Sequence, residues 1–127
     1  MSSLNKATLI GNLGKDPELR ATPSGKVVAS LSIATDETWP DPSTGEKKQH
    51  TEWHEVEVWG AQAEAAGAHL KKGERVYVEG RIRTDRWEDK ETKEHRSRKK
   101  IVANRIIFAG ARGAGTVNPN ELELIDF

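Results

Sequence analysis

Four tryptophans are the side chains of this sequence with the clearest chemical use, and charged residues flank each of them: Trp39, Trp53, Trp59 and Trp87. Two of them stand in the alternating stretch TEWHEVEVWG (51–60), on its charged face and opposite the more apolar His54, Val56 and Val58. An indole can stack on the flat face of any nucleic-acid base, which contributes about 1–3 kcal/mol per base. The pattern therefore predicts an outward aromatic surface that unpaired bases would cover.

Such a surface needs positive charge beside it to neutralise phosphates. The net charge of the chain is zero, but the charges are sorted along it. Residues 36–57 hold seven acidic and two basic residues, a net of −5, and residues 81–105 hold ten basic and five acidic residues, a net of +5. Sorted charge indicates facing surfaces or a charged partner. The candidate phosphate contacts are Lys6, Arg20, Arg75, Arg81, Arg83, Arg86, Lys99 and Lys100.

Five strands and one helix are predicted to position these side chains. The strands cover residues 7–14, 26–35, 51–60, 74–87 and 101–110, and an alanine-rich helix covers 61–71, with Gly73 just past its end. Residues 15–25 are expected to form a loop, 36–50 a hairpin arm with its tip near Gly45, and 88–100 a second charged excursion. In the strand 74–87, the alternation predicts that Val76, Val78 and Ile82 face the core, whereas Arg75, Tyr77, Arg81 and Arg83 face solvent.

The order strand-strand-strand-helix-strand-strand is that of an OB-fold: an all-β, five-stranded Greek-key barrel, here with one short helix and long hairpin loops. Another small barrel with an inserted helix is the alternative. At 127 residues the chain fits one domain, which we place at residues 1–110, followed by a short flexible linker and an acidic tip at 111–127. With no long apolar run and no apolar segment after Met1, we expect a cytoplasmic protein without a membrane partner.

Other functional classes find little support in the sequence. The four histidines accompany no metal-binding or nucleotide-binding motif, and the glycines of GNLG (11–14) are better interpreted as a strand bend or bulge than as a phosphate loop. The chain has no cysteine, which excludes disulfides and thiolate metal sites. We therefore expect no enzymatic activity, no metal and no cofactor. Two alternatives stay open: an RNA-binding or primosome-type OB protein, and tryptophans that form subunit contacts instead of stacking on bases.

A family resemblance adds to this interpretation. The stretches LNKATLIGNLGKDPELR, PSGKVVASLSIAT, TGEKKQHTEWHEVEVWG, HLKKGERVYVEGRIRT and RWED resemble, in this order, the bacterial single-stranded DNA-binding protein family, and the match runs from Leu4 to Ala109. The resemblance implies OB-fold chains that form a homotetramer, wrap single-stranded DNA and protect it in replication, recombination and repair near the nucleoid. It maps the family's stacking aromatics onto the four tryptophans, and its DNA path onto Lys6, Arg20, Lys72, Arg83 and Arg86. It places His54 at or near a subunit contact.

This sequence departs from the family in two acidic positions. Glu55 and Glu57 share a face with two of the stacking residues, where relatives often have a basic or apolar side chain. Either these carboxylates pair with the basic residues of strand 74–87, or they weaken binding and flatten its salt dependence.

The chain end, NELELIDF, is a second departure. Relatives close with an acidic run and Ile-Pro-Phe, which docks on replication and repair proteins. Here Ile125 and Phe127 match, Asp126 replaces the proline, and leucines alternate with Glu121 and Glu123. The resemblance implies a shortened docking tip, and the alternatives are a disordered end or a short strand that packs on a neighbouring chain.

Overall fold

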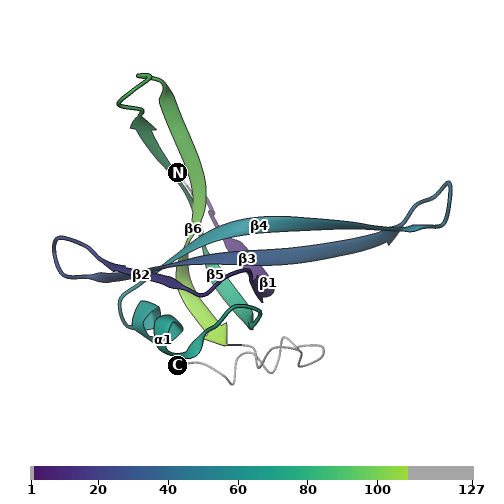
Figure 1. Cartoon of the computed structure of the whole chain (residues 1–127), viewed down its shortest axis with the longest axis horizontal. Helices are drawn as coiled ribbons and strands as arrows, with labels where there is room; N and C mark the ends of the chain where they lie inside the picture. The colour runs from purple at the N-terminus through teal and green to yellow at the C-terminus, as the bar shows by residue number, and fades with distance from the viewer. Residues whose placement is uncertain (1, 109–127) are drawn as a thin grey trace.

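The computed structural model describes residues 2–108 of the chain, so the predicted linker and acidic tip (111–127) lie outside the described residues. The elements are β1 (Ala7–Leu13), β2 (Glu18–Ala21), β3 (Val27–Pro40), β4 (Lys47–Trp59), α1 (Ala61–His69), β5 (Arg75–Glu88) and β6 (His95–Phe108). Figure 1 shows a small body with α1 on one side and two long hairpins that leave it in different directions.

Five of the strands close into a barrel. Neighbouring strands run in the order β1-β5-β6-β4-β3, and β1 pairs again with β3 through Asn12 and Leu13. Only β4 and β6 pair in parallel, at Val56 with Ile101 and at Glu57 with Val102, among the pairings that the described residues form. The predicted fold is confirmed: this is the closed five-stranded barrel of an OB-fold with one short helix.

Alternating aliphatic side chains fill the barrel. The side chains with 1% exposure or less include Leu31, Ile33, Val56, Val58, Val76, Val78 and Ile106. The helix adds Ala63 and Ala66, both fully buried. The prediction that alternate residues of β5 face the core is therefore right for Val76 and Val78. It is wrong for Ile82, which is 47% exposed. This residue follows the buried Gly80 at the point where β5 leaves the barrel, so the alternation continues but no core remains to cover it.

Two predicted boundaries around β1 and α1 are wrong. Residues 18–21 form β2, which pairs with β3 over Val27–Ser30, because Pro17 and Pro23 flank this strand and do not interrupt it. The helix ends at His69, since Leu70 turns into an extended conformation and is 3% exposed in the core. Gly73 belongs to the next turn, where its N–H donates to the Leu13 carbonyl at 2.8 Å.

The bend predicted in GNLG lies at Gly14, just after β1, and the strand runs without interruption through Gly11. A Cβ at this position would overlap the carbonyl oxygen of Ala34 and lie 2.7 Å from Cγ2 of Ile33. Glycine is required here because β1 approaches β3 closely where the barrel closes.

Two arms extend the barrel. The β3–β4 ladder continues to Pro40 opposite Lys47, which confirms the arm predicted near Gly45. The β5–β6 ladder continues to Glu88 opposite His95, so most of the predicted second excursion is strand. The start of β6 at His95 was missed because residues 95–100 are almost all charged or polar, and only their partner strand holds them extended.

The two arms end in the same turn. Asp41 and Asp89 each accept, through Oδ1, the backbone N–H groups of the residues two and three positions later. Each also accepts, through its carbonyl, an N–H at 2.8 Å from a residue with positive φ: Gly45 at 74° and Lys93 at 59°. One arm therefore uses a glycine where the other holds a lysine in the left-handed region.

Candidate nucleic-acid interface

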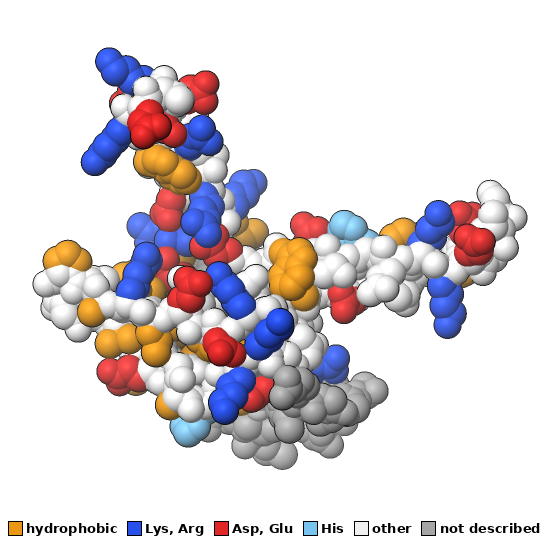
Figure 2. Space-filling model, in the orientation of Figure 1, with side chains coloured by type: hydrophobic (Ala, Val, Ile, Leu, Met, Phe, Trp, Pro, Cys, Tyr) orange, Lys and Arg blue, Asp and Glu red, His pale blue; other side chains and the backbone are white. Residues whose placement is uncertain are grey.

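The outer face of the barrel carries a mixed row of aromatic and charged side chains. Strand alternation places them on one side, away from the core: Trp53, Glu55, Glu57 and Trp59 of β4, Arg83, Asp85 and Trp87 of β5, and Arg98 and Lys100 of β6. Figure 2 shows lysine and arginine side chains along the β5–β6 arm and at its base, with acidic side chains between them. The charges sorted along the sequence are thus mixed in space.

A cleft opens on this face where the two arms meet. Its lining residues include Lys15, Arg20, Trp53, Glu55, Glu57, Asp85, Arg98 and Lys100. Three predicted residues meet here from different strands, Arg20, Trp53 and Lys100. Lys15 and Arg98 are cations that the sequence analysis missed. Arg98 could have been found from its spacing of two from Lys100, had β6 been extended to include it.

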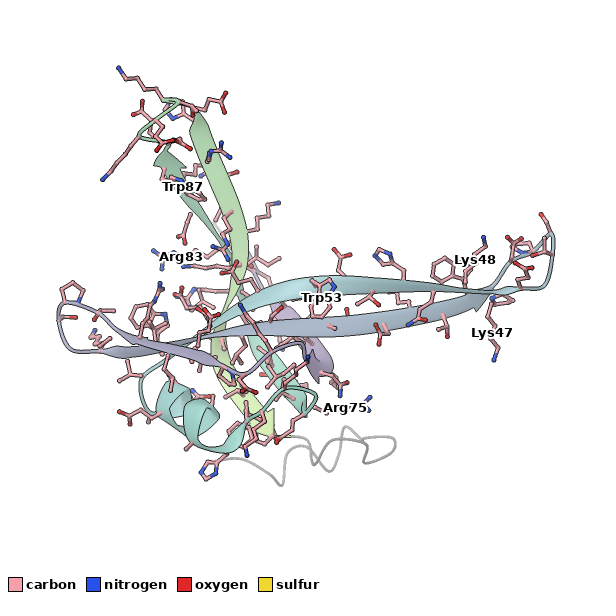
Figure 3. The ribbon with its side chains drawn as sticks, viewed as in Figure 1. Lys47, Lys48, Trp53, Arg75, Arg83 and Trp87 are labelled. Carbon is pink, nitrogen blue, oxygen red and sulfur yellow. The ribbon has the colours of Figure 1, made fainter. Side chains whose placement is uncertain are left out.

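All four tryptophans are exposed, at 44% for Trp39, 58% for Trp53, 39% for Trp59 and 45% for Trp87. They do not form one flat surface. Trp53 lies opposite Ala34 and Trp39 opposite Lys48, so alternation puts Trp39 and Trp53 on opposite sides of the β3–β4 arm. The predicted stacking surface is therefore divided: Trp53 and Trp87 are on different arms (Figure 3), and Trp39 is on the other side of the β3–β4 arm from Trp53.

Three other predicted cations lie on the β5–β6 arm. Arg83 follows the outer face into the β5–β6 arm towards Trp87 (Figure 3), whereas Arg86 and Lys99 are on the other side of that arm. Lys99 lines a second hollow together with Trp53 and the exposed Ile82.

Four further cations lie outside the cleft. Arg81 donates to Oδ1 of Asn104 at 3.1 Å. Lys6 precedes β1, beside the start of the β5–β6 arm. Arg75 begins β5, at the end of the strand opposite the arm (Figure 3), and Lys72 precedes it in the turn that follows α1. The structure does not bring these four residues to the cleft.

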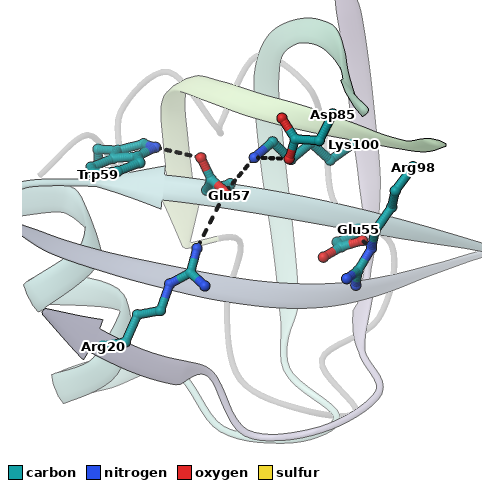
Figure 4. A network of polar contacts seen from close by, with 7 residues as sticks. All are labelled: Arg20, Glu55, Glu57, Trp59, Asp85, Arg98 and Lys100. Atoms are coloured by element: carbon teal, nitrogen blue, oxygen red, sulfur yellow. Dashed lines mark hydrogen bonds and ion pairs between the residues drawn. The ribbon is translucent and has the colours of Figure 1, made fainter. Parts of the chain in front are cut away.

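A carboxylate occupies the centre of the cleft. Glu57 is buried, with 7% exposure, although it lies on the charged face of β4. Its Oε2 lies 2.7 Å from Nζ of Lys100 and 3.7 Å from Nη2 of Arg20, and its Oε1 accepts the indole N–H of Trp59 at 2.7 Å (Figure 4). Lys100 also contacts Oδ2 of Asp85 at 2.7 Å.

Glu55, the other acidic position at which the sequence departs from the family, is also paired. Glu55 forms an ion pair with Arg98 (Figure 4). The predicted pairing of Glu55 and Glu57 is real, but the cations come from β6 and β2 and not from the strand 74–87. That strand contributes an acid, Asp85, because the register of β5 against β6 brings it beside Lys100.

This network shifts two pKa values in opposite directions. The hydrogen bond from Lys100 lowers the pKa of Asp85 below its usual value. Burial disfavours the charged form of Lys100, but its hydrogen bonds to Asp85 and Glu57 outweigh that effect and raise the pKa of this ammonium. Both directions keep the pair ionised.

Two histidines have local partners within the chain. His54 is half-buried, and its Nε2 lies 2.8 Å from the hydroxyl of Thr35. The ring of His69, at the end of α1, lies 6.1 Å from the ring of Phe108. Within residues 2–108 there is no group of three or more His, Asp or Glu that could hold a metal ion. No helix in this same range has the length and hydropathy to cross a membrane.

A closed barrel whose outer face and arms carry exposed indoles beside cations defines an OB-fold protein of the nucleic-acid-binding class. The profile of the Single-strand binding protein family matches residues 4–109, and the chain therefore belongs to this family. The resemblance noted in the sequence is confirmed.

Solved structures agree with this assignment. An SSB of Plasmodium falciparum in complex with ssDNA is 33% identical, with a TM-score of 0.78, over 87% of this chain and 98% of that one. A deletion mutant of the single-stranded DNA binding protein from Thermus aquaticus is 34% identical, with a TM-score of 0.73, over 87% of this chain and 52% of that one.

Proposed function

We propose that this chain binds single-stranded DNA without sequence preference and protects it during replication, recombination and repair. The observation that carries the proposal is the cleft at the base of the arms, where the most exposed indole, that of Trp53, stands beside cations of β2, of β6 and of the loop before β2. Bases stack on the tryptophans, and lysines and arginines contact the phosphates. The proposed activity is binding and not catalysis, in keeping with the family.

The proposed path follows the outer face. A strand passes Trp59, crosses the cleft at Trp53 and continues along the β5–β6 arm past Arg83 to Trp87. Segments that go around the arms reach Trp39, Arg86 and Lys99 on their other sides, and a longer strand that wraps the barrel reaches Lys6, Lys72, Arg75 and Arg81.

Tryptophan fluorescence provides the test. Oligo(dT) should quench the emission strongly, and blunt duplex should have little effect, because a duplex hides its base faces. Trp53→Ala and Trp87→Ala should each weaken binding by about 1–3 kcal/mol at about 0.2 M salt. Trp53→Phe and Trp87→Phe are the matched controls, since they keep an aromatic plate and should retain most of the affinity. Parental affinity in both alanine variants would contradict the stacking role, and metal-dependent cleavage of a labelled oligonucleotide would contradict the binding-only proposal.

DNA is the proposed substrate in preference to RNA. One relative of similar structure is described in complex with ssDNA. The residues that line the cleft do not indicate which side chain would contact the 2′-hydroxyl of RNA. A competition between oligo(dT) and oligo(U) therefore decides whether DNA or RNA is preferred. Tighter binding of oligo(U) would favour the RNA-binding alternative.

The proposed assembly is a homotetramer with His54 at or near a subunit contact. Among the described residues β1 pairs with β3 only at Asn12 and Leu13, so its earlier residues leave an edge open on that side. Leu4, 87% exposed, and Ile10, 37% exposed, add apolar surface beside that edge. Sedimentation should give about four times the 14.1 kDa chain mass. A stable monomer at micromolar concentration would overturn the assembly.

The proposed role of residues 111–127 is to recruit replication and repair proteins, with residues 1–110 as the binding domain. Deletion of Glu121–Phe127 should abolish recovery of such partners from a bacterial extract and leave oligo(dT) affinity unchanged or slightly higher at low salt. Unchanged recovery would remove the docking role, and loss of tetramers would indicate packing on a neighbouring chain instead.

A further inference from the structure

The central cleft is electrically neutral, although β5 and β6 are rich in basic residues. The cations that line it are Lys15, Arg20, Arg98 and Lys100, and the carboxylates that line it are equal in number: Glu18, Glu55, Glu57 and Asp85. Each of these cations is within ion-pair distance of one or two of these carboxylates. Cations that a phosphate would use are therefore already occupied.

We propose that Glu55 and Glu57 act as built-in competitors of the DNA phosphates, which lower the affinity of the cleft and make binding less dependent on salt. The inference rests on the proposed function, because it concerns the same cleft. A carboxylate oxygen and a phosphate oxygen accept the same charge-assisted hydrogen bonds from lysine and arginine. A phosphate at the cleft centre must therefore displace a carboxylate or remain without a cation.

Lys100 is the cation least available to DNA. Its side chain is 12% exposed, and two carboxylate oxygens lie 2.7 Å from its Nζ. Taking this ammonium away would leave Glu57, 9% exposed at its side chain, as a buried charge without its closest partner. Such a state is costly, so Glu57 and Lys100 stay together when the strand binds. Lys100 then serves the cleft by holding Glu57 and Asp85, not by contacting phosphate.

Arg20 and Arg98 can move more easily. Their side chains are 64% and 61% exposed, so solvent surrounds most of each guanidinium. Either arginine can turn to a phosphate, but Glu55 or Glu57 then loses a partner and stays close to the incoming negative charge. The carboxylates thus oppose phosphate binding whether or not the arginines move.

The position of Glu57 concentrates its opposition to phosphate at the stacking residues of β4. Glu57 lies between Trp53 and Trp59 on β4 and also accepts the indole N–H of Trp59. A strand that stacks on both indoles must pass over it. Binding here draws on stacking more than on counterion release, which gives a shallow dependence on salt.

Glu55→Gln and Glu57→Gln test the inference, because both changes keep the shape of the side chain and remove one negative charge. Affinity for oligo(dT) is measured by tryptophan quenching at about 50 and 200 mM salt. Each variant should bind more tightly than the parent. Each additional phosphate that a freed cation neutralises steepens the slope of log K against log salt by about 0.7, so the increase in affinity should be about 2.6-fold larger at the lower salt.

Glu64→Gln is the matched control, since it removes the same charge from an exposed position on α1 outside the cleft. It should leave both the affinity and the slope as in the parent. Arg98→Gln adds a second check: it should cost little affinity in the parent and remove the increase in the Glu55→Gln background, because only there is Arg98 free to contact phosphate.

Slopes equal to the parental slope in both glutamate variants would overturn the inference, as would an equal increase in affinity in Glu64→Gln. Thermal unfolding shows whether Glu57→Gln remains folded, and if it does not, Glu55→Gln decides alone. Failure of the proposed function can be distinguished from failure of this inference, because oligo(dT) would then not quench the fluorescence of the parent protein.

Discussion

Gly14 lies directly against the indole of Trp53, at the rim of the central cleft. A Cβ at Gly14 would overlap the six-membered ring, at 2.7 Å from Cη2 and closer still to Cζ3. The glycine after β1 therefore provides the space in which the indole of Trp53 lies, and it fixes the orientation of this ring.

Gly14→Ala should displace the Trp53 ring and weaken oligo(dT) binding, by an amount smaller than the loss in Trp53→Ala. The reason is that the methyl group moves the stacking plate but does not remove it. The measurement is a double-mutant cycle with Trp53→Ala, in which Gly14→Ala should have no further effect once the ring is absent. Additive losses would mean that Gly14 acts through another residue.

Trp39→Ala should matter only for long strands. This indole is on the arm side opposite Trp53, so a strand of about 8 nucleotides that occupies the cleft does not reach it. We expect near-parental affinity for such a short oligo(dT) and a clear loss for one several times longer, with Trp39→Phe as the control for both. An equal loss with the short strand would place Trp39 in the same stacking surface as Trp53.

Lys93→Gly should stabilise the tip of the β5–β6 arm. Lys93 has a φ of 59°, a conformation that costs a residue with a Cβ roughly 1 kcal/mol, and the matching turn of the other arm has Gly45 there. The measurement is hydrogen exchange of the Asp89 and Lys93 amides, which are bonded across the turn and should become more protected. Gly45→Lys is the reciprocal control and should loosen the β3–β4 tip to a similar degree. No change in either tip would mean that the side-chain cap of the aspartate fixes the turn by itself.

Stability should fall in acid partly through Asp85. Its pKa is lowered in the folded chain, chiefly by the hydrogen bond from Lys100, so the stabilisation is present above the unfolded value of about 3.9 and is lost as the pH falls through the folded value. For Lys100, whose pKa is raised, the stabilisation is present below about 10.4 and is lost as the pH rises through the folded value.

Thermal unfolding followed across pH tests this assignment. Asp85→Asn should flatten the acid side of the curve slightly, because the carboxyl is exposed and the effect is screened. The acid loss should not vanish, since backbone N–H groups of Glu91 and Thr92 lower the pKa of Asp89 in the same direction. Glu64→Gln on α1 serves as the control, and a curve identical to the parental one in Asp85→Asn would contradict the role of this carboxylate.

The sequence predicts well wherever a side chain needs only its own strand to explain it. Val56 and Val58 alternate with charged neighbours, and both are fully buried as predicted. The turn residues around Gly45 predict the β3–β4 arm correctly, because an aspartate cap and a glycine are local signals. The order of elements and the family motifs then suffice to predict the OB-fold.

The errors occur where another strand, and not a residue's own alternation, decides its place. Residues 18–21 form a strand of four exposed residues between two prolines, and residues 95–100 are all charged or polar, so only the ladders with β3 and β5 hold them extended. Ile82 has the right parity for the core, but the barrel ends before it.

The sequence by itself determined that this chain forms an all-β barrel with outward tryptophans, because a period of two fixes which side chains share a face. Only the tertiary structure decided what stands beside those tryptophans. Glu57 is buried because the parallel contact of β4 with β6 places Lys100 against it, and β2 brings Arg20 to the same carboxylate. Ion pairs between residues 37 and 43 positions apart depend on how strands from distant parts of the chain pack, and no local pattern of charges contains that information.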